Sequence, residues 1–351
     1  MWAATCRNGI IGTVEREDNA PDAEAVIAAF GLDWPVAGWV QVGGAWSNRV
    51  YRLNAGASAF AVKEMVNPWG VERWQQQLEV SWSFELLAIE AGIATPSPVR
   101  NPATGGCLAW VRNKGGIEVP VRVHQWVPGR PFPPEVVDAD TATWAGNVLA
   151  VLHGLEIKPD DRELFPVPNV NTATTWSELT EAAASEGVEW AALMKNAAAA
   201  VDAIAELVLS DGHRPAEEIL SHGDIDQKNL IATELGPALC DWDVASPVVP
   251  RRELADVALS MGRWQDFSVA RQVVRAYRAA GGDDTEFTAP DLGMPMMVGI
   301  DWVAFNVDRA LGRRPASPAD VARAHKLLPD LLAAIPHELE TAMRITDILR
   351  V

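Results

Sequence analysis

The chain has 351 residues, 48% of them hydrophobic and 22% charged, which is typical of an ordinary globular protein with one large domain or two lobes. Its net charge of −18, from 29 basic and 47 acidic residues, argues against a nucleic-acid partner, because phosphates attract basic surfaces. The same acidity is compatible with a cationic small-molecule partner, or with a solubilising surface alone.

The cysteines and the hydropathy of the chain argue against a secreted, zinc-binding or membrane-spanning protein. Cys6, Cys107 and Cys240 are widely spaced and form no CxxC motif, so neither a disulfide framework nor a zinc site is predicted. No run of about eighteen apolar residues predicts a membrane span, and no basic stretch followed by an apolar run predicts a secretory signal. We therefore expect a cytoplasmic protein without a membrane partner, as a monomer or a homodimer.

The first third of the chain is predicted to be rich in strands. The first helix follows Pro21 and ends at Gly31, both of which are typical helix boundaries. Alternating apolar residues around an Asn54-Ala55-Gly56 turn then predict paired strands. In chain order, the predicted elements are a helix over 22–30, strands over 39–53 and 60–65, a helix over 71–91, and strands over 107–111 and 119–127.

A stretch dense in proline and glycine, residues 127–134, divides this part from a mainly helical remainder. We expect an N-terminal nucleotide-binding lobe over 1–127 and a C-terminal helical lobe over 128–351, which is an α+β architecture. Only residues 219–243 break the helical pattern, with short apolar runs between turn residues. The predicted helices cover 141–155, 188–209, 253–261, 269–280, 298–311 and 319–335.

The most informative segment is His222-Gly223-Asp224-Ile225-Asp226-Gln227-Lys228-Asn229, which Asp241-Trp242-Asp243 follows twelve residues later. Two carboxylates and an amide at this spacing are the groups needed to hold a magnesium-bound triphosphate and to orient a hydroxyl. Asp224 is expected to align the attacking hydroxyl, and Asn229 and Asp241 to bind Mg²⁺ through hard oxygen donors. A turn rich in Asp and Asn between two strands is the simpler structural alternative.

Residues 221–231 resemble the catalytic loop of the aminoglycoside phosphotransferase / choline kinase superfamily of small-molecule kinases, and residues 239–243 resemble its metal-aspartate strand. The chain departs from the commonest pattern at Asp226 and Lys228, where His and Gly are frequent. The resemblance implies a protein-kinase-like, two-lobed fold that uses ATP (or GTP) and Mg²⁺.

Two helices extend this resemblance. Residues 252–258 resemble the helix that follows the metal aspartate, where Asp256 would be a structural anchor. Residues 149–155 are similar to the family's helix ending in a Leu-His pair, and His153 is expected to serve in packing.

On the nucleotide side, residues 42–53 resemble the family's phosphate loop between the first two strands. Gly43 and Gly44 would let the backbone turn tightly, and Ser47 and Asn48 would offer donors to phosphate oxygens. Lys63, which follows Ala61 and Val62 on the next strand, is expected to bind the α- and β-phosphates. An ordinary hairpin and a surface lysine on an edge strand are the alternatives.

The resemblance implies that a carboxylate of the 71–91 helix holds Lys63, and Glu79 and Glu85 are the candidates. Glu79 is preferred, because its distance from the Gly-Ile-Ala-Thr-Pro segment is nearer to that in family members. Main-chain groups near Gln125 to Val127 resemble those that bind a purine edge. These groups do not distinguish ATP from GTP.

The acceptor side is expected in the helical lobe, where Asp301, Phe305 and Asp308 fall near one helix face and could contact an ammonium group. A solvated face of an amphipathic helix is the alternative. We expect transfer of the ATP γ-phosphoryl group to a hydroxyl of a small, polar, cationic molecule. An aminoglycoside or related antibiotic is favoured over an amino sugar, a choline-like alcohol or homoserine. A nucleotide-binding regulator without turnover is the rival class.

Overall fold

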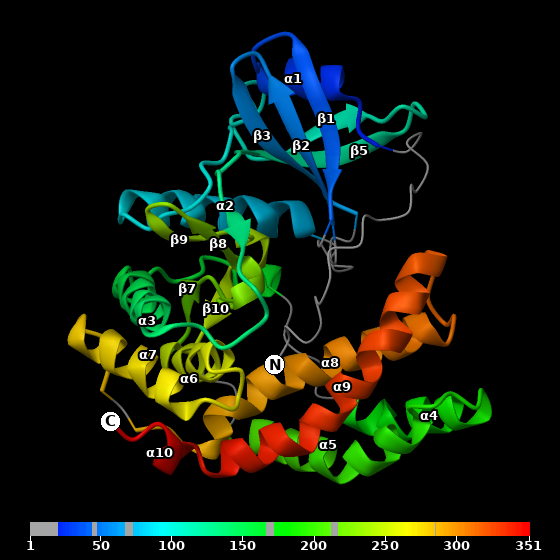
Figure 1. The fold of residues 1–351 in the computed structure, drawn as a ribbon, viewed down its shortest axis with the longest axis vertical. Helices are drawn as coiled ribbons and strands as arrows, with labels where there is room; N and C mark the ends of the chain where they lie inside the picture. Colours follow the sequence, from blue (N-terminus) through cyan, green and yellow to red (C-terminus); the bar gives the residue numbers. More distant parts are fainter. Residues whose placement is uncertain (1–19, 44–47, 67–72, 166–171, 212–216, 285) are drawn as a thin grey trace.

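The structure, a computed structural model, describes residues 20–43, 48–66, 73–165, 172–211, 217–284 and 286–351. A strand-rich N-terminal lobe stands above a mainly helical C-terminal lobe (Figure 1). This is the α+β, two-lobed architecture that the sequence predicts. No helix in the described ranges is long and apolar enough to cross a membrane.

The N-terminal lobe contains a five-stranded antiparallel sheet of order β1-β2-β3-β5-β4. The predicted hairpin at residues 54–56 joins β2 to β3, where Ala55 pairs with Ser58. The bounds are β1 (Val36–Val42), β2 (Arg49–Ala55), β3 (Ser58–Glu64), β4 (Ala109–Arg112) and β5 (Glu118–Gln125).

The two faces of this sheet differ in polarity, because successive residues of a strand point to opposite faces. Val62 and Val123 face α1 (Ala23–Phe30) and form one apolar cluster with it. Lys63 and Arg122, which pair directly across β3 and β5, share the other face. That face contacts α2 (Trp74–Glu90), which lies below the sheet in Figure 1, so charged side chains of the sheet point towards the C-terminal lobe.

The C-terminal lobe is built from helices. Two of them lie outside the predicted ranges: α4, whose buried Trp176, Leu179 and Ala183 recur at helical spacing, and the short α10. The helix α9 continues through Pro336, where the prediction ended. The bounds are α3 (Ala139–Gly154), α4 (Thr172–Ser185), α5 (Ala191–Asp211), α6 (Pro250–Met261), α7 (Phe267–Ala279), α8 (Gly293–Ala310), α9 (Pro318–Met343) and α10 (Ile345–Ile348).

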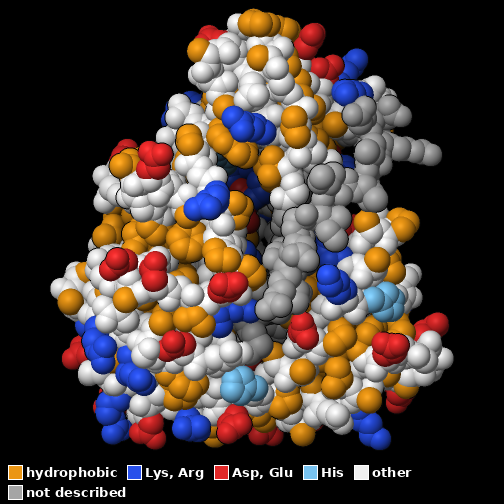
Figure 2. All heavy atoms as spheres, in the orientation of Figure 1, with side chains coloured by type: hydrophobic (Ala, Val, Ile, Leu, Met, Phe, Trp, Pro, Cys, Tyr) orange, Lys and Arg blue, Asp and Glu red, His pale blue; other side chains and the backbone are white. Residues whose placement is uncertain are grey.

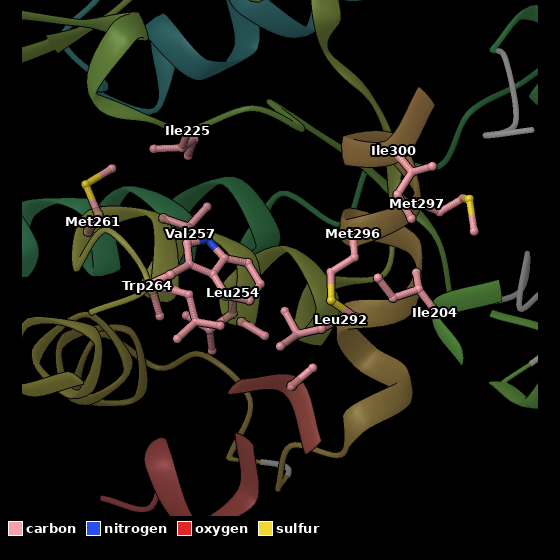
Figure 3. Packing of buried hydrophobic residues seen from close by; sticks show 14 of the residues in the cluster. Ile204, Ile225, Leu254, Val257, Met261, Trp264, Leu292, Met296, Met297 and Ile300 are labelled. Atoms are coloured by element: carbon pink, nitrogen blue, oxygen red, sulfur yellow. The ribbon is translucent and has the colours of Figure 1, made fainter. Parts of the chain in front are cut away.

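A large apolar core holds these helices together (Figure 3). Leu254 and Val257 of α6 belong to it together with Leu292 and Met296, at the beginning of α8. Ile225, the neighbour of Asp224, is buried in the same core. The core thus fixes the backbone beside the predicted catalytic carboxylate.

Short strands flank the predicted site residues Asp224, Asn229 and Asp241. β7 (Ile219–Ser221) pairs with β10 (Ser246–Val248), and the hairpin of β8 (Leu230–Thr233) and β9 (Gly236–Leu239) pairs with β6 (Arg130–Pro131). Figure 2 shows a recess between the upper and lower parts of the molecule, in which charged side chains are visible.

Candidate active site

The β8–β9 hairpin brings the three predicted oxygen donors together. Leu230 pairs with Leu239, so the residues before and after the hairpin are neighbours, and the Cys240 amide donates to the Asn229 carbonyl at 2.9 Å. The Asn229 Nδ2 donates to Asp224 Oδ2 at 3.0 Å and to the Asp224 carbonyl at 2.8 Å. Asp224, Asn229 and Asp241 therefore line one site.

Lys63 reaches the same site from the sheet. Its ammonium group contacts Asp241 and lies 2.5 Å from Asp243 Oδ2. Burial would lower the pKa of Lys63, but the two carboxylates outweigh this effect and hold the pKa above its ordinary value. Lys63 lies on an inner strand with its side chain mostly buried, which excludes the alternative of a surface lysine.

The carboxylate partner of Lys63 was predicted wrongly. Glu79 accepts the Cys107 amide at 3.0 Å instead of contacting Lys63. Glu85 is buried and contacts Arg122 Nη2 at 2.9 Å and His124 Nε2 at 3.0 Å. The two glutamates are six residues apart, which places them about 240° apart around the helix, so only Glu85 faces the sheet.

A buried arginine completes this part of the site. Arg122, only 1% exposed, contacts Asp243 with Nη1 and Glu85 with Nη2. Burial would raise the pKa of Asp243, but Lys63 and Arg122 hold it below its usual range. Asp243 is thus an ionised carboxylate shared between two cations.

His222 shapes the catalytic loop as a neutral residue. Its Nε2 lies 3.0 Å from the Cys240 carbonyl, which can only accept, so Nε2 carries the proton. Its Nδ1 then accepts the Asp224 amide at 3.3 Å. Burial lowers the pKa of His222, in agreement with the neutral ring. Gly223 follows with φ of 76°, where a Cβ would come within 2.9 Å of Ser246 Oγ.

The loop is anchored by Glu253, a residue that received no role from the sequence. Glu253 Oε1 accepts the Gly223 amide at 2.7 Å, and its Oε2 lies 2.7 Å from His153 Nε2. His153 Nδ1 lies 2.9 Å from the Tyr277 hydroxyl, so His153 is a hydrogen-bonded bridge and not only a packing residue. Asp256 lies one helical turn further along α6.

Asp224 lies near two other carboxylates, Asp226 and Asp256, and one cation, Lys228. Lys228 Nζ lies 2.7 Å from Asp224 Oδ1. Burial raises the pKa of Asp224, Asp226 acts in the same direction, and Lys228 opposes both. Burial together with the charges of Asp224 and Asp226 raises the pKa of Asp256 to about 7. The potential at this end of the site is therefore negative.

Of the four residues predicted to form the phosphate loop, the structure describes two, Gly43 and Asn48. Gly44 and Ser47 lie outside the described residues. Gly43 follows β1 directly and has nothing within 4 Å of its ideal Cβ position. Asn48 Oδ1 accepts the Val66 amide at 3.2 Å, which ties Asn48 to the residues after β3. Asn48 thus has a structural bond on its oxygen.

The connection after β5 offers one main-chain donor. The Gln125 amide already donates to the Ser97 carbonyl and the Trp126 amide to Ala59, both at 2.8 Å. The Val127 amide makes no hydrogen bond within the described part of the chain. Of the two residues predicted to bind the purine edge, Val127 therefore has the open amide and Gln125 does not.

The predicted acceptor residues on α8 contact their own neighbours. Asp301 accepts from Thr172, and Asp308 lies 3.5 Å from Arg313. Phe305 lies beneath the guanidinium groups of Arg309 and Arg314, at 4.3 and 4.2 Å from its ring centroid. This helix face is therefore mixed in charge, and the structure does not join it to Asp224.

The oxygen donors fit magnesium shared with phosphate. Asn229 uses Nδ2 towards Asp224, and neither its Oδ1 nor Asp241 Oδ2 has a hydrogen bond to the described residues. Among these residues no group of three His, Cys, Asp or Glu side chains is arranged to hold a metal. Mg²⁺ commonly takes one or two protein ligands and completes its shell with phosphate and water.

Three residues of the site were missed by sequence reasoning, namely Arg122, Asp243 and Glu253. Arg122 stands between Val121 and Val123 on a strand, and a charge between two apolar neighbours is a signal that could have found it. Asp243 stood within the quoted motif but received no role. For Glu253 the sequence holds no signal that separates it from Asp256, since both lie on one helix.

A sequence profile of the phosphotransferase enzyme family matches residues 38–290. No curated protein matches the sequence. Among solved structures, a spectinomycin phosphotransferase in complex with ADP and spectinomycin has a TM-score of 0.66 at 14% identity, covering 90% of this chain and 97% of that one.

Two further solved structures are similar. A microcompartment-associated aminopropanol kinase has a TM-score of 0.62 at 16% identity, with 93% of this chain and all of that one covered. Choline kinase from Cryptosporidium parvum has a TM-score of 0.57 at 11% identity, with 88% and 92% covered. At these identities the likeness establishes a kinase-like fold.

Proposed function

Because the chain belongs to the phosphotransferase enzyme family, we propose that it transfers the γ-phosphoryl group of ATP to a hydroxyl of a small polar acceptor. The observation that carries this proposal is the convergence of Lys63 and Asp241, from different lobes, beside Asn229 and Asp224. GTP is the alternative donor, because a main-chain contact at Val127 accommodates either purine.

In the proposed reaction, the acceptor oxygen forms a bond to the γ-phosphorus while the bond to the ADP oxygen breaks. Asp224 orients the acceptor hydroxyl and takes its proton, and its ordered position depends on Asn229 and Lys228. Lys63 binds phosphate oxygens. Asn229 and Asp241 would hold Mg²⁺, which would supply charge neutralisation for the triphosphate.

We propose a cationic acceptor on electrostatic grounds. The carboxylates of Asp224, Asp226 and Asp256 lie close enough to disfavour one another's charge, and an ammonium group beside them would relieve this repulsion. Aminoglycosides and related antibiotics are the favoured class, and amino sugars, choline-like alcohols and homoserine are alternatives. The face of Asp301, Phe305 and Asp308 remains a proposed contact only, given its arginine neighbours.

The test is magnesium-dependent ATP consumption by the full chain against a panel of aminoglycosides and amino alcohols. Asp224→Asn should lower kcat by about 10²–10⁴-fold, because the proton acceptor is lost, while nucleotide affinity changes little. Asp347→Asn, at an exposed aspartate of α10 outside the site, is the matched control and should keep the wild-type kcat.

Nucleotide binding without ATP consumption would contradict the proposed reaction. If the wild-type chain binds nucleotide but consumes ATP with no acceptor, and Asp224→Asn behaves identically, the protein is a nucleotide-binding regulator and the proposed reaction is wrong.

A further inference from the structure

We propose that Arg122 is a positioning residue for Lys63, the lysine proposed to bind the nucleotide phosphates. Arg122 contacts both Glu85 of α2 and Asp243, and Asp243 in turn contacts Lys63. The inference rests on the proposed function, since it concerns how the phosphate-binding lysine is held. Two bonds of one guanidinium carry it: Nη2 contacts Glu85 at 2.9 Å, and Nη1 contacts Asp243, whose other oxygen contacts Lys63.

The strand register places Lys63 and Arg122 side by side, so an anion between them is required. Lys63 and Arg122 pair directly across β3 and β5, so two cations share one face of the sheet at neighbouring positions. Like charges at such positions destabilise a sheet unless anions separate them. Asp243 supplies one oxygen to each cation and lies between them, which fixes the direction in which Lys63 points.

Glu85 does not hold Lys63 directly because both of its oxygens are engaged. Oε1 lies 3.0 Å from His124 Nε2, and Oε2 lies 2.9 Å from Arg122. Within this cluster the charges of Lys63 and Arg122 balance those of Glu85 and Asp243. The remaining carboxylate, Asp241, is about one-third exposed and faces the site.

The planar guanidinium is essential to this role. It presents donors in a fixed fork that serves two carboxylates at once, whereas a lysine ammonium on a flexible stem is a single point charge. Arg122→Lys therefore keeps the charge but leaves either Glu85 or Asp243 without its partner.

The decisive experiment uses a charge-balanced double variant, Glu85→Gln with Arg122→Met, in the full chain. We expect the Kd for Mg²⁺ and AMP-PNP, measured by calorimetry, to rise at least about tenfold. The unfolding temperature should fall less than for Arg122→Met alone, because the double variant removes one buried positive and one buried negative charge together and Asp243 keeps its contact with Lys63. If the Arg122–Glu85 pair served only the stability of the fold, the folded double variant would bind AMP-PNP with the wild-type Kd.

A second arm tests whether Arg122 acts through Lys63. In the Lys63→Met background the same double substitution should change the Kd by less than about twofold, since the contact it supports is already gone. The matched control is Arg162→Met with Glu218→Gln, another mostly buried arginine–glutamate pair outside the site, which should keep the wild-type Kd.

Each outcome is decisive. A double variant that binds AMP-PNP as tightly as wild type, or an effect that persists in full without Lys63, overturns the inference. If the double variant does not fold, Arg122→Lys is judged by the same tenfold criterion. A wild-type chain that does not bind Mg²⁺ and AMP-PNP at all refutes the proposed function instead.

Discussion

Glu253 joins the catalytic loop to two helices through the Gly223 amide and His153. Burial would raise the pKa of Glu253, but these partners lower it from its ordinary value of 4.5. Its contribution to folding is therefore present above about pH 4.5 and is lost as the pH falls through the folded-state pKa. Glu253→Gln should cost about 2–3 kcal/mol at pH 7, and this difference should shrink on acidification. Urea unfolding of both proteins between pH 7 and pH 4 measures it.

The exposed Glu340 provides the control for this prediction. Glu340→Gln removes the same charge without a buried partner, so its effect on the free energy of unfolding should be small at every pH. A Glu253→Gln difference that is constant over the pH range would show that the carboxylate's charge is not what anchors the loop.

At the residue scale, local sequence patterns predicted which side chains carry oxygen or charge, but not all of their partners. Asp224, Asn229 and Asp241 come together because a short hairpin closes between them, which turn residues reveal. The partner of Lys63 depends on the rotation of α2 and on Arg122 from a strand about sixty residues away, and nothing local encodes that geometry.

At the scale of the elements, α3 and α7 pack through a glycine. A Cβ on Gly146 would lie 2.3 Å from the Val273 carbonyl and 2.8 Å from the Ala276 Cβ. Gly146→Ala should therefore destabilise the protein by about 1–3 kcal/mol, although alanine favours a helix. Chemical denaturation measures the loss.

The same helix offers the control. Gly154, the last residue of α3, has nothing within 4 Å of its ideal Cβ position, so Gly154→Ala should be neutral or stabilise the fold by up to about 1 kcal/mol. Equal effects at both positions would mean that helix propensity, and not the contact with α7, decides the outcome.

Most elements were predictable because their boundaries carry strong local signals. Asp22 caps α1 by accepting the Glu24 amide, and Gly31 ends it with φ of 62°. The helix α9 was predicted to end at residue 335, yet it continues to Met343 through Pro336, a residue type that normally interrupts a helix. Its buried stripe, which includes Leu328, Leu332 and Ile335, stabilises it through packing that a single sequence does not reveal.

At the scale of the whole molecule, the proposed site draws Lys63 from one lobe and Asp241 from the other. A nucleotide that binds only the folded chain should therefore stabilise it, by about 2.7 kcal/mol at a concentration of 100 times Kd. Chelation of Mg²⁺ should remove most of this gain. Thermal unfolding with ATP, in the presence of Mg²⁺ or of EDTA, measures the difference.

Asp241→Asn should lose the magnesium-dependent part of the gain, whereas Asp308→Asn should retain it. An equal rise in Tm with and without Mg²⁺ would show that the metal does not bind at Asp241.

The connection between β5 and β6 is held to the structure at both of its ends. Gln125 and Trp126 are tied to the sheet side by their amides, and a Cβ on Gly129 would meet Ile231 at 2.5 Å, so this glycine lies tight against β8. Between these two ties, neither Val127 nor Pro128 makes a main-chain hydrogen bond to the described residues. Since the proline ring fixes its own φ, any rocking of the sheet through this connection is confined to very few torsions. The Val127 amide proposed to bind the purine therefore lies on the short stretch between these two ties, where the backbone has little freedom to move it away.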